Sequence, residues 1–172
     1  MTPLPHENLL TVMGEVAAAF VGFSLVVSAL RARSNDSLDE TRRFYSMREV
    51  AEIGLVCVFA SFLPLVIHAF GASPDAIWRI GSATFLALGV LSGSASFWRR
   101  GGLLVTLRSE PILAAILVPT LFGFYGLLLV NLFAGGPGSG ARYVAALLLS
   151  LVVSGVIFVN ATFNTARDRP DA

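Results

Sequence analysis

Glu15 is the residue whose position in this chain most needs a chemical explanation. It lies within residues 8–30, which hold no other charged side chain. An acid at membrane depth costs on the order of 2.5–3.5 kcal/mol on insertion scales. Because that cost has to be offset, the sequence predicts that protein, and not lipid, surrounds Glu15.

Five further residues are predicted at a similar depth and are candidate partners of Glu15: His68, Arg79 and Arg142, with Asn131 and Tyr125 as neutral hydrogen-bond partners. One interpretation is a proton or cation site, in which Glu15 accepts the proton and His68 titrates beside it. A second is an ion pair with Arg79 or Arg142 that joins two helices. A third is a protonated Glu15 that is hydrogen-bonded to a neighbour. The sequence leaves all three open.

Glu49 and Glu52 form a second acidic group, at the opposite end of a predicted span. Several copies of this helix around one axis would present a ring of carboxylates, which attracts cations to a pore. A simpler interpretation is a solvated turn that is neutralised by Arg48, Arg42 and Arg43. The spacing favours the simpler interpretation, because Arg48 and Glu52 are four residues apart and can pair along a helix.

The residue types that carry most enzyme chemistry are scarce. The whole chain has two histidines and one cysteine, too few for a zinc or haem site of ordinary composition. It also lacks a Gly-x-Ser-x-Gly elbow, a phosphate-binding loop and a dinucleotide-binding fingerprint. We therefore expect neither an enzyme nor a bound metal or cofactor, and no nucleic-acid partner.

Five apolar stretches must position these candidates. Each is about 20 residues long, enough to cross a bilayer core of about 30 Å at about 1.5 Å per residue. They are residues 8–30, 49–70, 78–98, 112–133 and 142–160. With 172 residues and 55% hydrophobic content, the chain has no room for a soluble domain beside them. The prediction is an all-α fold, a single transmembrane helical domain over residues 1–172.

The arginines predict the orientation of the five spans. All twelve basic residues are arginine, and ten of them fall in the segments on one side of the membrane. Only Arg79 and Arg142 fall on the other side. By the positive-inside rule, the N-terminus is outside and the C-terminus is in the cytoplasm. The use of arginine without lysine is typical of GC-rich bacterial genomes, so we expect a multi-pass protein of the bacterial inner membrane.

The first span has a face of small residues. Glu15 lies on it, and bulky side chains occupy the opposite face, which suits lipid. Small residues allow another helix to approach closely, so this face is predicted to pack against protein. Its members are Thr11, Gly14, Glu15, Ala18, Gly22, Leu25 and Ala29. The third span is also rich in glycine, alanine and serine, and is predicted to be the most enclosed of the five.

The chain has a possible internal repeat. A shift of 63 residues superposes His68 on Asn131, Pro74 on Pro137 and Arg79 on Arg142. Spans two and three would then be one copy of a helical hairpin and spans four and five a second, as in transporters built from parallel repeats. A chance match between apolar segments is the alternative.

Two classes of function fit this architecture. The first is an oligomeric ion- or proton-conducting channel or transporter that uses Glu15 and His68. The second is a non-catalytic subunit or scaffold of a larger membrane complex. Five spans of this length enclose little volume, so a pathway is expected between subunits. The predicted partners are the lipid bilayer and either further copies of the chain or other membrane subunits.

Overall fold

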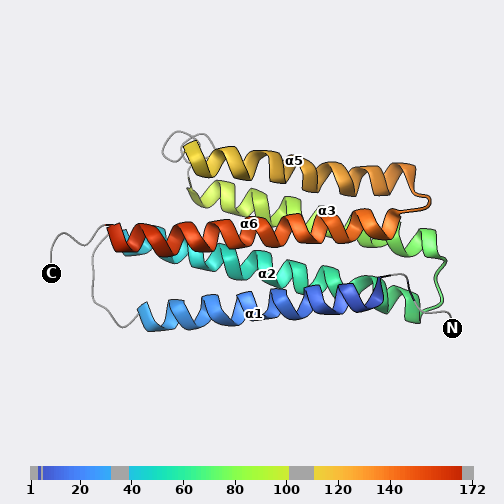
Figure 1. The fold of residues 1–172 in the computed structure, drawn as a ribbon, viewed down its shortest axis with the longest axis horizontal. Coiled ribbons are helices and arrows are strands. Elements are labelled where there is room, and N and C mark those ends of the chain that lie inside the picture. The colour runs from blue at the N-terminus through green and yellow to red at the C-terminus, as the bar shows by residue number, and fades with distance from the viewer. Residues whose placement is uncertain (1–3, 5, 32–38, 101–110, 168–172) are drawn as a thin grey trace.

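The described part of the chain is entirely helical. The structure is a computed structural model, which describes residue 4 and residues 6–31, 39–100 and 111–167. Its helices are α1 (Glu7–Arg31), α2 (Asp39–Ala69), α3 (Pro74–Arg100), α5 (Pro111–Ala134) and α6 (Ser139–Arg167) (Figure 1). All five are long and apolar enough to cross a membrane. This confirms the prediction of an all-α, multi-pass membrane protein.

The predicted and observed spans agree to within about one helical turn. The largest difference is at α3, which starts at Pro74 and not at residue 78. Ser73 begins the helix, because its side-chain oxygen accepts a hydrogen bond from the Ala76 N–H at 3.4 Å. Proline at the next position suits a helix start, since its missing N–H would have no partner there. Helix α2 is continuous from Asp39 to Ala69 and begins nine residues before its apolar part, which starts at Arg48.

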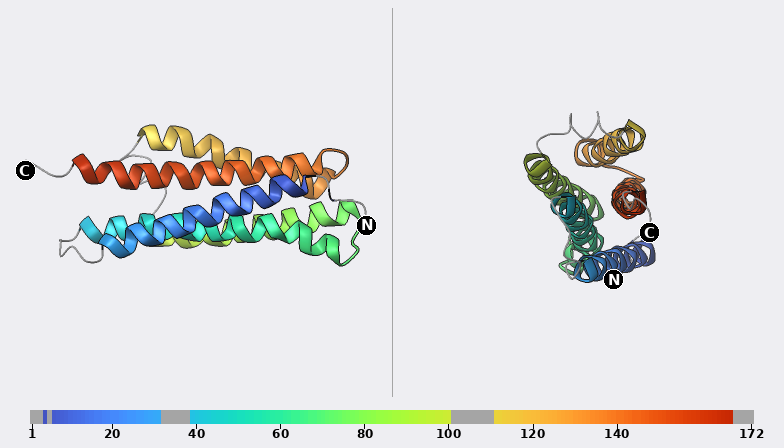
Figure 2. Two further views of the ribbon diagram at one scale, coloured as in Figure 1. Left: turned by 60° about the horizontal axis from the view of Figure 1, so that its bottom comes forward. Right: turned by 90° about the vertical axis from the view of Figure 1, so that its left-hand side faces the viewer.

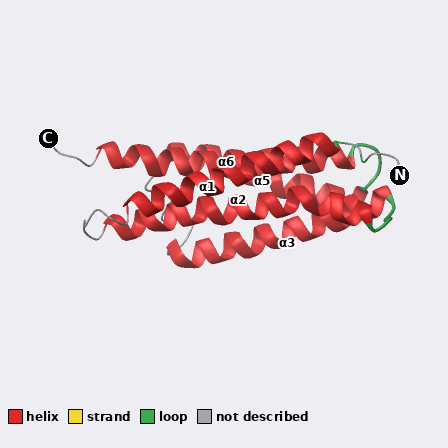
Figure 3. Cartoon of the chain, turned by 90° about the horizontal axis from the view of Figure 1, so that it is seen from below, coloured by secondary structure: helices red, strands yellow, loops and turns green. Residues whose placement is uncertain are grey.

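The helices run side by side along one long axis, and α2 and α6 occupy the middle. Helix α2 packs against α1, α3 and α6, while α6 packs against α2 and α5 and makes smaller contacts with α1 and α3. Helices α1 and α5 lie at opposite edges without touching each other, as the end-on view in Figure 2 shows. The turns that join α2 to α3 and α5 to α6 both lie at the end of the bundle nearest the N-terminus (Figure 3). We call this the amino-terminal end.

The prediction that the third span is the most enclosed was wrong. In the membrane-spanning part of α3, 28% of the residues are buried, against 39% in α2 and in α6. Gly81, Ser82 and Phe85 in the first half of α3 are buried, whereas Gly93, Ser94 and Ala95 are exposed. Small residues permit close packing, but the position of the helix in the bundle decides whether a neighbour is present.

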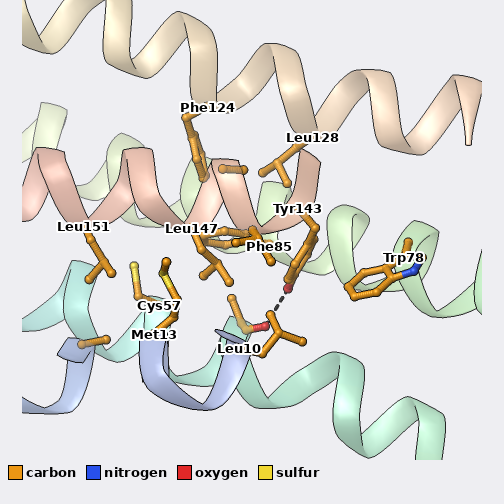
Figure 4. Close-up of a cluster of buried hydrophobic side chains, with 14 of the residues drawn as sticks. Leu10, Met13, Cys57, Trp78, Phe85, Phe124, Leu128, Tyr143, Leu147 and Leu151 are labelled. Carbon is orange, nitrogen blue, oxygen red and sulfur yellow. Dashed lines mark hydrogen bonds between the residues drawn. The ribbon is translucent and has the colours of Figure 1, made fainter. Parts of the chain in front are cut away.

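Aromatic side chains fill the centre of the bundle. Phe85 of α3 packs edge-on against Phe124 of α5, with ring centroids 5.0 Å apart, and against Tyr143 of α6 at 5.8 Å. Trp78 contacts the other side of Tyr143 at 5.7 Å (Figure 4). Such pairs favour tilted and edge-on geometries over stacked ones. At this level, rings from three helices occupy the space that a path through a single chain would need.

Tyr143 also supplies a hydrogen bond that the backbone of α2 lacks. Pro64 lies inside α2 and has no N–H, so the carbonyl of Ala60 lacks its usual helical donor. The Tyr143 hydroxyl donates a hydrogen bond to this carbonyl at 2.7 Å (Figure 4). Both residues are fully buried. A bilayer core holds no water that could replace this hydrogen bond. The bond therefore joins α6 to α2 at the position where the backbone of α2 lacks a hydrogen bond of its own.

Glycines set the spacing and the register of the α1–α2 pair. A Cβ atom added to Gly14 would lie 3.0 Å from the ring of Phe62 and 3.3 Å from Ser61 Cβ. One added to Gly54 would lie 2.6 Å from Val21 Cγ2. The two antiparallel helices therefore cross closely at two points, and residues whose numbers add to about 75 lie at the same level.

Replacing Gly54 with alanine is expected to destabilise the protein by about 1–3 kcal/mol, because Val21 is short and stiff and the two helices must move apart. The free energy of unfolding in mixed detergent micelles measures this. Gly126→Ala is the matched control, because nothing lies within 4 Å of the Cβ that it adds. Equal stability of the two variants would contradict the close crossing of α1 and α2.

Candidate functional site

A buried polar network lies at the amino-terminal end, around the last turn of α5. Asn131 is fully buried. Its Nδ2 donates hydrogen bonds to the Ser139 carbonyl at 2.8 Å and to Ser82 Oγ at 3.2 Å. Its Oδ1 accepts one from Arg142 Nε at 2.8 Å. The side chain therefore ties α3, α5 and α6 together with each polar atom partnered, as buried amides require.

Arg142 holds the turn between α5 and α6. Its Nη2 donates hydrogen bonds to the Gly135 carbonyl and to Ser139 Oγ. The turn follows a path with positive φ angles of 57° at Gly135, 82° at Gly136 and 93° at Gly138, which glycine adopts readily. A cation at the carboxyl end of α5 is also favoured by the helix dipole. Within the described residues, Arg142 donates hydrogen bonds only to neutral acceptors. These bonds support a structural role for Arg142.

Arg79 approaches the same turn from α3. A Cβ atom added to Gly135 would lie 2.9 Å from Arg79 Nη2. The side chain is exposed. Within the described ranges, no hydrogen bond or ion pair joins Arg79 to Glu15, and none joins Arg142 to Glu15. The ion pair considered from the sequence is therefore absent from the described part of a single chain.

Glu15 and His68 lie at different levels of the bundle. From the α1–α2 register, Glu15 is level with Ala60, whereas His68 is level with Glu7 near the amino-terminal end. The difference of eight residues corresponds to about 12 Å along the helix axis. The expectation that both lie at a similar depth was wrong, because α2 continues for about two and a half turns beyond the level of Glu15.

The face of α1 that carries Glu15 is exposed in the single chain. Ala18, Gly22 and Ala29 are exposed with it, and no atom lies within 4 Å of a Cβ added to Gly22. The packed face is a different one, formed by Leu10, Met13, Ala17 and Ser24. Within the described residues, Gly14 packs against Ser61 and Phe62 of α2, so the prediction that the small residues pack against protein holds at Gly14 and fails at Ala18, Gly22 and Ala29. The reason is that α1 lies at the edge of the bundle and meets α2 mainly along its other side.

The second acidic group lies toward the opposite end of α2. Arg48 Nε donates a hydrogen bond to Glu52 Oε1 at 2.8 Å, which confirms the predicted pair. Glu49 is buried, close to where Ser154 of α6 donates to the Val50 carbonyl at 3.5 Å. The side chains of Arg42 and Arg43, the other expected partners, lie outside the described residues.

The structure therefore divides the predicted candidates into separate groups. Asn131 and Arg142 are bonded to each other, and Arg79 lies beside them. Glu15 has no hydrogen-bond or ion-pair partner among the described residues and lies on the outside of α1, and Glu49 and Glu52 are at the other end. Sequence reasoning missed Ser82, Ser139 and Tyr143. A signal for Tyr143 existed, because a proline inside a membrane helix leaves a carbonyl four residues earlier that needs a donor.

Among the described residues, no group of three or more His, Cys, Asp and Glu side chains is arranged to hold a metal ion. Comparison with models of protein families, with curated proteins and with solved structures finds no match to this chain. Function is therefore inferred from the geometry of the chain's own residues.

Proposed function

We propose that this protein is a homo-oligomer of the membrane that conducts protons or small cations along the interface between its copies, past Glu15. The observation that carries the proposal is the exposed carboxyl of Glu15 on an open face of a membrane-spanning helix. Glu15 is eight residues after Glu7, so it lies about 12 Å inside α1.

The proposed oligomer is supported by the unfavourable free energy of leaving the Glu15 face of α1 in contact with lipid. A carboxyl group that faces acyl chains is unfavourable by a few kcal/mol. The α1 face around it is open and made of small residues, and Ala18 and Gly22 would let the α1 helix of a second copy approach closely. The Glu15 side chains of the two copies would then lie near each other. Carboxyl groups accept and release protons, so such a pair would pass protons along the interface.

A path between copies is supported by the packing inside each copy. Tyr143 and Ala60 are hydrogen-bonded in the centre of the bundle at the same level as Glu15. The carboxyl group therefore faces outward at a depth where rings and backbone fill the interior. His68 lies about 12 Å nearer the amino-terminal end, where it would serve the mouth of the path and not its acidic centre.

We place the N-terminus outside and the C-terminus in the cytoplasm of a bacterial inner membrane, on the distribution of the arginines. We also propose that the α2–α3 and α5–α6 hairpins are duplicates. If the hairpins are duplicates, α2 corresponds to α5 and α3 corresponds to α6. The α2–α6 contact then corresponds to the α5–α3 contact, and the bundle contains both contacts. Helix α1 is then an addition to a four-helix unit with approximate two-fold symmetry.

Proton flux into liposomes that hold the purified protein tests the conduction. The wild-type protein is expected to acidify a dye-loaded lumen under an inward proton gradient, and Glu15→Gln is expected to reduce the rate to that of protein-free liposomes. Glu7→Gln is the matched control, because Glu7 is an exposed acid in the first turn of the same helix.

The mass of the protein in mild detergent tests the oligomer separately. We expect a closed homo-oligomer for the wild type and a smaller species for Gly22→Leu, in which a bulky side chain stands on the open α1 face. A folded wild-type protein that leaves the liposomes tight would refute conduction. A stable monomer, or a complex with a different co-purifying subunit, would favour the scaffold function instead.

A further inference from the structure

Two arginines from different helices meet at the glycine turn between α5 and α6. Arg142 Nη2 donates a hydrogen bond to the carbonyl of Gly135. The guanidinium group of Arg79 lies on the other side of this residue, where a Cβ atom would be 2.9 Å from Nη2 and 3.2 Å from Nε. Both cations therefore contact the same residue, and the absence of a side chain on Gly135 is what lets Arg79 come so close.

The positive charge at this turn is not neutralised by the described residues. Arg142 uses Nε and Nη2 for bonds to Asn131, Gly135 and Ser139, and its Nη1 takes part in none of them. The described part of the chain contains no hydrogen bond or ion pair of Arg79. Asp75 lies one turn before Arg79 on α3, yet it forms no ion pair with Arg79 within the described ranges. Within the described residues, the guanidinium group of Arg79 and the Nη1 atom of Arg142 therefore carry N–H groups that donate no hydrogen bond.

The location indicates which anion would use these donors. Arg79 is five residues after the start of α3, and Arg142 is three residues after the start of α6. Both are therefore within about 8 Å of the ends of their helices, the level of the lipid headgroups. Arginine binds phosphate with two parallel hydrogen bonds and good geometry.

We propose that Arg79 and Arg142 form a binding site for a phosphate group at the surface of the bilayer. Arg142 is held in place by Asn131, which is fully buried, and Arg79 closes on the phosphate from the side of α3. The group can be the headgroup of an anionic phospholipid or a free phosphate. Within the described residues the site forms no hydrogen bond or ion pair with Glu15, and it does not depend on conduction.

Lipid binding is measured on the intact protein in phosphatidylcholine nanodiscs that contain increasing amounts of phosphatidylglycerol. Native mass spectrometry counts the lipids that stay bound. We expect the wild-type protein to prefer phosphatidylglycerol, and Arg79→Gln to weaken this preference by about tenfold, the loss of one bidentate charged contact. Arg48→Gln is the matched control, because Arg48 is an arginine near the opposite end that is paired with Glu52.

A glycine pair provides a second test that keeps both arginines. Gly135→Ala places a methyl group against Arg79, whereas Gly136→Ala adds the same group at a positive φ angle with nothing within 4 Å. We expect phosphatidylglycerol binding to weaken in Gly135→Ala only. This comparison separates the displacement of Arg79 from the strain of a non-glycine residue in the turn.

Titration of the detergent-solubilised protein with inorganic phosphate distinguishes the two sources. Binding that Arg79→Gln removes, without a preference among lipids, would assign the site to a soluble phosphate. A preference among lipids without such binding would assign it to the headgroup. Equal binding of both lipids together with no binding of phosphate, or an equal loss in Arg79→Gln and Arg48→Gln, would overturn the proposal.

Discussion

Asn131→Leu is expected to destabilise the protein by about 2–4 kcal/mol. Leucine is close to asparagine in size, so the loss comes from the polar groups and not from the packing. The change removes the acceptor of Arg142 Nε and the donor to the Ser139 carbonyl, both at 2.8 Å, as well as the contact with Ser82. Buried polar groups that lose their partners cost about 1–3 kcal/mol each, and charged groups cost more.

The free energy of unfolding in mixed micelles, followed by the loss of helical circular dichroism, measures this effect. Asn8→Leu is the control, because it makes the same change at an exposed position of α1, where the expected effect is below about 0.5 kcal/mol. Asn131→Asp is expected to fall between the two, since it keeps the acceptor for Arg142 and loses both donors. If Asn131→Leu were as stable as Asn8→Leu, the network would not join the three helices.

Tyr143→Phe is expected to destabilise the protein by about 1–2 kcal/mol, a large effect for the loss of one oxygen atom. The hydroxyl is the donor to the Ala60 carbonyl, at 2.7 Å, and Pro64 cannot supply another. Without water in the bilayer core, the carbonyl then stays unsatisfied. Hydrogen bonds between membrane helices average less than this, and the missing helical donor is the reason to expect more here.

A double-mutant cycle with Pro64→Ala isolates this cause. Alanine at position 64 restores an N–H that can bond to the Ala60 carbonyl, so Tyr143→Phe should cost much less in that background. The coupling between the two changes is expected to be about 1 kcal/mol. Equal costs of Tyr143→Phe with and without Pro64 would show that the contribution of the hydroxyl does not depend on the backbone donor that Pro64 lacks.

The sequence was sufficient to predict the five long apolar helices of the described residues and most of their limits. A helix that crosses a bilayer must be about 20 apolar residues long, and this requirement is local, so it can be read from the chain without its neighbours. The same holds for the Arg48–Glu52 pair, because both residues lie on one helix at a spacing that brings them together. The start of α3 was placed four residues late, since the apolar run gave no weight to Ser73 and Pro74.

The sites depended on contacts between helices, which the sequence did not specify. The periodicity of α1 correctly separated a small face from a bulky one, but it could not tell which helix covers either face. The structure leaves Glu15 on the uncovered side. The link from Asn131 to Ser82 and the link from Tyr143 to Ala60 join residues 49 and 83 positions apart. Which helices are neighbours, and how each is rotated about its axis, is decided when all five pack together, because apolar side chains fit lipid almost as well as they fit one another.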